Sequence, residues 1–144
     1  MKKQGSILIE VMAAVMILML TTTFIVSATI QSRNILRERI LQEEVSRTIC
    51  NLISEFKYNL TKEEIEEMLS REDDKIGFRY SEDLSKRLVD TDVRELERGD
   101  DIEISRLAED NMGVKLKIEA KINSNGDEAF LEKEFTKSWW MDET

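Results

Sequence analysis

One carboxylate stands alone in a long apolar segment near the start of the chain. Glu10 is the only charged residue from Ser6 through Ile30, and its neighbours are aliphatic residues, methionine, alanine, threonine, serine and phenylalanine. A carboxylate inside a bilayer costs about 2.5 kcal/mol or more on insertion scales, so such a group is usually paired with a cation. The chemistry that this pattern indicates is therefore charge pairing in a membrane.

The rest of the chain carries no pattern that would support catalysis. The 144 residues include no histidine, the commonest metal ligand and the usual general base, and a single cysteine, Cys50. Nucleophile elbows, phosphate-binding loops and zinc spacings are missing from the sequence. The acidic pairs Asp73-Asp74, Asp100-Asp101 and Asp127-Glu128 lack the ordered spacing of a calcium loop. We therefore expect no enzyme, no metal site and no cofactor.

The charge balance argues against a nucleic-acid partner. The chain has 30 acidic and 21 basic residues, which gives a formal net charge of −9. Proteins that bind nucleic acid through counterion release need clustered lysine and arginine facing the phosphates. We expect no such binding here.

The apolar segment fits a membrane better than a protein core. About 25 residues in a helix span roughly 37 Å, which exceeds the ~30 Å hydrocarbon core of a bilayer. A plain signal anchor is one interpretation, although basic residues lie on both sides of the segment, at Lys2 and Lys3 and again from Arg33. A cleaved secretory signal is another, with small residues at Val26-Ser27-Ala28, but Glu10 and the length of the segment argue against it.

The residues around Glu10 resemble the amino terminus of type IV prepilins. A short basic stretch ends at Gly5, and Ser6, three aliphatic residues and Glu10 follow, with the sequence LIEV intact at 8–11. The resemblance implies that a prepilin peptidase cuts between Gly5 and Ser6 and that Ser6 is N-methylated. Residues 1–5 would then be a leader peptide and residues 6–30 a transmembrane helix that becomes the filament core.

Cleavage would also create a partner for the isolated carboxylate. The new α-amino group of Ser6 is a cation at the same depth in the membrane as Glu10. The resemblance implies that the two groups pair between adjacent subunits during assembly. The alternative is that Glu10 interacts only with the dipole and the free N–H groups of its own helix.

The resemblance implies the role of a minor type IV pilin. Ser6 stands where major pilins typically have phenylalanine, which favours a minor subunit, at the tip or in assembly priming. The implied partners are the major pilin, other minor pilins, the prepilin peptidase, the assembly platform and the lipid around residues 6–30. The chain would reside in the bacterial cytoplasmic membrane with its amino terminus inside, and later in an extracellular pilus. The alternatives are a pseudopilin of a type II secretion or DNA-uptake system, and a single-pass membrane anchor with a sensory or scaffold domain.

The sequence pattern predicts that residues 31–144 form a polar domain of the α+β class. Apolar residues recur at helical spacing over 31–58, and this pattern predicts that the membrane helix continues and packs on a sheet. A parallel coiled coil is the alternative for 35–56. Strict alternation over 114–122, with turn residues on both sides, predicts the centre of a three-stranded antiparallel meander over 101–140. The expected fold is a long helix packed on a small sheet, as in pilins.

Shorter segments carry weaker predictions. Thr61 and Glu64 have the spacing of a capping box, which predicts a helix over 62–71. A short strand is expected at 76–80, and residues 84–96 fit either helix or loop.

Three side chains invite interpretation. Cys50 follows an apolar helical position, so we expect it to be buried as a small hydrophobic residue, with an exposed thiol as the alternative. Trp139 and Trp140 would point to opposite faces of a strand, so one should join the core. The other either packs against a loop or is a candidate partner-binding residue.

Overall fold

The computed structural model describes residues 2–70, 74–124 and 126–142. The chain divides into two units, Met1–Arg37 and Glu38–Thr144. Each unit is described by itself below.

The first unit is helical throughout its described residues and belongs to helix α1 (Lys2–Ser54). An 18-residue window near the amino terminus has a mean hydropathy of 2.2 and no buried residue, so by length and composition the helix can cross a membrane. The threonine hydroxyl groups in this stretch donate to carbonyl groups of their own helix. Thr22 and Thr23 each donate to the carbonyl four residues earlier at 2.8 Å. No polar group of these threonines therefore needs water or a partner helix.

In the second unit the last turns of α1 supply the helical layer of the core. Val45, Ile49, Leu52 and Phe56 recur every three or four residues and are fully buried. Phe56 lies in η1 (Glu55–Asn59), a short π-helix that continues α1. Because this face is covered inside the unit, it is not available for the parallel coiled coil considered above.

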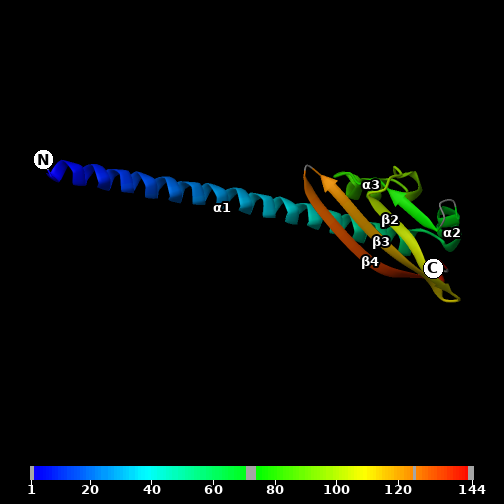
Figure 1. Cartoon of the computed structure of the whole chain (residues 1–144). Helices are drawn as coiled ribbons and strands as arrows, with labels where there is room; N and C mark the ends of the chain where they lie inside the picture. The colour runs from blue at the N-terminus through cyan, green and yellow to red at the C-terminus, as the bar shows by residue number, and fades with distance from the viewer. Residues whose placement is uncertain (1, 71–73, 125, 143–144) are drawn as a thin grey trace. The chain divides into compact units, whose positions relative to one another are not determined.

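A four-stranded antiparallel sheet forms the second layer (Figure 1). The strands are β1 (Lys75–Phe78), β2 (Ile102–Asp110), β3 (Gly113–Ser124) and β4 (Asp127–Ser138), in the spatial order β1-β2-β3-β4. The predicted meander corresponds to β2, β3 and β4. The short strand expected at 76–80 ends at Phe78 and adds a fourth strand by pairing with β2.

Short helices connect the two layers. Helix α2 (Lys62–Ser70) begins with the predicted capping box, because the Thr61 N–H donates to Glu64 Oε2 at 3.0 Å and the Glu64 N–H donates to Thr61 Oγ1 at 3.4 Å. Position 71, the last of the predicted helix, lies outside the described residues. The ambiguous stretch 84–96 contains helix α3 (Leu84–Asp90) and a 3₁₀ turn, η2 (Val93–Glu95).

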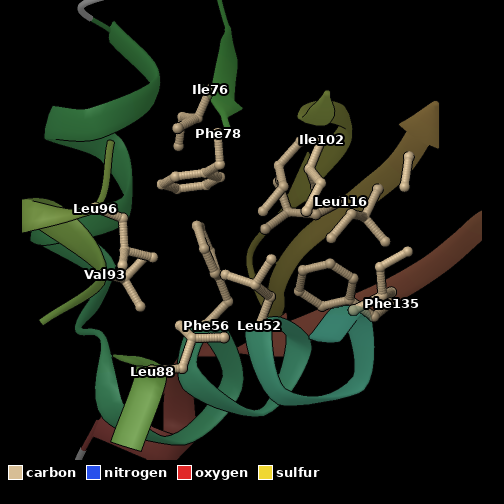
Figure 2. Close-up of a cluster of buried hydrophobic side chains, with 14 of the residues drawn as sticks. Leu52, Phe56, Ile76, Phe78, Leu88, Val93, Leu96, Ile102, Leu116 and Phe135 are labelled. Atoms are coloured by element: carbon tan, nitrogen blue, oxygen red, sulfur yellow. The ribbon is translucent and has the colours of Figure 1, made fainter. Parts of the chain in front are cut away.

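Buried apolar side chains from the helices and strands meet in one cluster (Figure 2). Phe56 points from the end of α1 toward the sheet and meets Phe135 of β4 edge to face, with ring centroids 6.4 Å apart. Leu88, Val93 and Leu96 approach the cluster from the connecting segment. The expected fold, α+β with a long N-terminal helix packed on a small antiparallel sheet in the pilin-like manner, is confirmed.

Candidate functional site

Glu10 is exposed on α1 among exposed apolar side chains. Ile7, Ile9 and Val11 have exposed fractions of 59%, 69% and 54%. The described helix begins at Lys2, and its first turn contains no acidic residue. The helix dipole acts within the first turn, so it stabilises Glu10 little in the uncut chain.

Cutting after Gly5 would change this geometry. The backbone of Gly5 and Ser6 is helical, whereas the surroundings of their side chains lie outside the described residues. With Ser6 as the first residue, its amino group and Glu10 would be four residues apart, which is a rise of roughly 6 Å along a helix. The candidate site would therefore consist of the Glu10 carboxylate and a cation created by cleavage, about one helical turn apart.

The two tryptophans lie beyond β4 rather than in it. The expected strand was too long, because β4 ends at Ser138 and both residues belong to the 3₁₀ helix η3 (Trp139–Asp142). Trp139 packs partly buried against the core, and the Lys62 ammonium lies 4.8 Å from its ring centroid. Trp140 is 63% exposed. One tryptophan thus points inward and one outward, as the alternation suggested, although the turn is helical.

Trp140 lies where three chain segments meet, each of which carries one exposed apolar or aromatic side chain, and the sequence did not reveal this arrangement. The Trp139 N–H donates to the Met112 carbonyl at 3.0 Å, and η3 lies against η1, which carries Tyr58. Tyr58, Met112 and Trp140 are each more than three-fifths exposed. We call these three residues the end patch. The signal in the sequence was weak, because Tyr58 and Met112 are far from Trp140 along the chain.

Cys50 is exposed, so the expectation that it is buried was wrong. One residue turns a helix by about 100°, so Cys50 faces away from the stripe to which its neighbour Ile49 belongs. The Lys133 ammonium donates to Cys50 Sγ at 3.2 Å.

Lys137 is a buried charged residue that sequence reasoning missed. Only 1% of its surface is exposed, and its Nζ donates to the Lys57 carbonyl at 2.9 Å. Lys137 lies two positions after buried Phe135, and the strand period of two therefore places it on the inner face of β4. Its ammonium satisfies a carbonyl near the end of the α1–η1 helix, where intrahelical partners run out.

The opposite face of the sheet is wet and charged. Lys117 pairs with Glu132 at 3.2 Å, and Lys115 pairs with Glu134. The hydrogen bond from Lys115 lowers the pKa of Glu134, and the hydrogen bonds from Lys117 and Lys121 lower the pKa of Glu119. These carboxylates therefore stay ionised to lower pH than free glutamate, and their bridges weaken only as the pH falls through the lowered values. Such exposed pairs contribute little to stability.

No group of three or more potential metal ligands occurs among the described residues. Comparison of the chain with protein-family models, with curated proteins and with solved structures finds no match.

Proposed function

We propose that this chain is a minor type IV pilin, inserted in the bacterial cytoplasmic membrane and later assembled into an extracellular filament. A prepilin peptidase would cut it between Gly5 and Ser6, and Ser6 would be N-methylated. Glu10 would then pair with the Ser6 amine of an adjacent subunit. The chain would act by binding and assembly, with the major pilin, other minor pilins and the assembly platform as partners.

One observation carries the proposal. Glu10 is the only charge in an apolar helical segment whose described side chains are exposed, and it follows Gly5-Ser6 at the prepilin spacing. An exposed apolar helix needs lipid or other helices around it. A carboxylate in that environment needs a cation, and cleavage after Gly5 supplies one.

The structure of the second unit is compatible with a filament subunit but does not by itself indicate that role. Its layers keep their own core covered, and the end patch leaves Trp140 available to another subunit. A pseudopilin would have the same processing and fold, and would differ in the machinery with which it assembles.

The mature amino terminus is the direct test of processing. We expect intact mass and N-terminal sequencing of membrane-derived protein to show Ser6 as the first residue, carrying a methyl group. A chain that keeps Met1 would instead support a single-pass anchor. A first residue at Thr29 would indicate a secreted domain released by signal peptidase, and it would end the pilin proposal.

The chain beginning at Gln31 should fold and stay soluble without detergent. The apolar side chains that pack the sheet are covered within the second unit, while the exposed apolar run of 7–30 is removed. Gel filtration with light scattering should report a monomer, and circular dichroism should show both helix and strand. A stable, almost fully helical dimer would contradict this expectation and favour a coiled coil.

A further inference from the structure

Strand β4 is a long, regular sheet edge that carries charged side chains. It has 12 residues, whereas β1 at the opposite edge has four. Proteins often block an edge with proline, a bulge, a very short strand or charged side chains, and β4 has only the last of these. The chain contains no proline, and the pairing of β3 with β4 runs without a register shift, in contrast to the shift between Arg106 and Ala108 in β2.

The register identifies which backbone groups face the open edge. The Trp139 N–H donates to the Met112 carbonyl, in line with the pairing of Gly113 with Ser138. Bonded and non-bonded pairs alternate in an antiparallel ladder, so every second residue of β4 turns its N–H and C=O away from β3. Ser138 at the end of β4 is one of them, and the five along its length, called the edge residues below, are Glu128, Phe130, Glu132, Glu134 and Thr136.

All five edge residues are exposed. Within the part of the chain that the structure describes, no backbone hydrogen bond joins them to a segment outside the sheet. The N–H and C=O groups of about five residues are therefore left to solvent, in one line along the strand. An extended peptide could pair with all of them by adding one strand to the sheet.

The charges on this edge specify what kind of strand would fit. Three of the five edge residues are glutamates, and none is basic. On the outer face of the sheet, diagonal ion pairs such as Lys75–Glu103 and Lys117–Glu132 join neighbouring strands, although the directly opposite residues Glu103, Glu119 and Glu132 are all acidic. Glu132 and Glu134 pair with lysines of β3, whereas Glu128 accepts a hydrogen bond from the Asn123 amide. A strand on their open side would continue the pattern if it carried lysine or arginine at alternate positions.

We propose that β4 is a docking edge for a fifth strand supplied by a partner protein, an extended segment with basic residues at every second position. A second copy of this chain is a poor occupant, because two β4 edges side by side would bring rows of glutamates together. The docking edge does not involve the end patch or processing at Gly5. The docking proposal can therefore be tested independently of the proposed pilin role.

The test uses the full chain in detergent micelles and synthetic peptides of about ten residues. The first peptide alternates lysine with valine and threonine. A second has the same composition with all its lysines in one block, and a third has glutamate in place of lysine. We expect the alternating peptide to bind at least about tenfold more tightly than the block peptide by fluorescence anisotropy, because only alternation places every lysine on the face of the glutamates.

Hydrogen exchange locates the binding. The alternating peptide should slow exchange at the amides of residues 128, 130, 132, 134 and 136, which face the edge, and leave the other amides of β4 unchanged. Equal affinity for the alternating and block peptides, or protection elsewhere, would overturn the proposal. Protection of the same amides without peptide, increasing with protein concentration, would identify a second copy as the occupant and would also overturn it.

Two substitutions at one position separate charge from backbone pairing. Glu132→Gln removes the carboxylate and keeps the N–H, whereas Glu132→Pro also removes an N–H that faces the open edge and bonds to no residue of β3. We expect Pro to weaken binding about threefold or more beyond Gln, the size of one lost hydrogen bond. Equal affinities of the two variants would reduce the contact to simple charge attraction and contradict strand addition. Glu95→Lys, on an exposed residue of η2, is the control for net charge and should bind as the parent does.

Discussion

Glu10→Ala should leave membrane insertion and cleavage after Gly5 intact and should remove most of the chain from assembled filaments. Alanine avoids the cost of about 2.5 kcal/mol or more for a carboxylate in the membrane, so insertion has no reason to fail. Assembly loses the partner of the Ser6 amine, and breaking a desolvated ion pair on one side costs about 3–5 kcal/mol. The substitution should therefore favour insertion and oppose assembly, so the two effects can be measured separately in one sample.

The measurement compares precursor and mature bands with crosslinking to the major subunit. Glu10→Asp keeps the charge on a side chain shorter by one methylene and should retain part of the crosslinking, whereas Glu10→Gln should behave as alanine does. A bulky substitution at Gly5 is the converse control, because it should block cleavage and leave the precursor in the membrane. If Glu10→Ala is cut and crosslinked like the parent chain, then the pairing role is wrong and Glu10 is merely tolerated in its helix.

Phe56→Ala should lower the free energy of unfolding of the second unit by about 3–5 kcal/mol, the usual cost of removing a buried aromatic ring. Phe56 is fully buried between α1, the sheet and the connecting segment, and it meets Phe135 edge to face (Figure 2). Its removal leaves a cavity where the two layers join. Total stabilities of small domains are only about 5–15 kcal/mol, so the variant should be close to unfolding at physiological temperature.

Tyr58→Ala is the matched control, because Tyr58 is an aromatic residue of the same short π-helix but is 67% exposed. Its effect on stability should stay within about 0.5 kcal/mol. Urea titration followed by tryptophan fluorescence reports both variants, since Trp139 packs partly buried against the core. Equal destabilisation by the two substitutions would contradict the packing described here.

Predictions from sequence succeeded where the signal was local and periodic. The helix spacing of Val45, Ile49 and Leu52 predicted a buried stripe, and the alternation over 114–122 predicted a half-covered strand. The capping box at Thr61 and Glu64 depends on residues three apart, so it could be read directly. The fold class could be predicted from these patterns, because an amphipathic helix and a sheet with one apolar face bury their apolar surfaces against each other.

The candidate assembly site was also identified from the sequence alone. The isolation of Glu10 and its distance from Gly5 and Ser6 are visible in the printed chain, and the structure adds that the surrounding apolar side chains are exposed. The role of this carboxylate depends on cleavage and on neighbouring subunits, and it stays a prediction.

Tertiary structure decided everything that depends on which distant segments meet. The burial of Lys137 required a carbonyl from Lys57, 80 residues away, to accept its hydrogen bond. The exposure of Cys50 followed from which stripe of α1 the sheet covers, and the end patch from the contact between η1 and η3. Strand order likewise made β4 an edge and left the outward N–H and C=O groups of alternate residues without a neighbouring strand. Sequence alone determined which segments form helices and which form strands, because the helical and strand repeats of apolar residues are properties of neighbouring positions. Long-range packing alone determined which segment each helix or strand packs against, because a local repeat carries no information about distant residues.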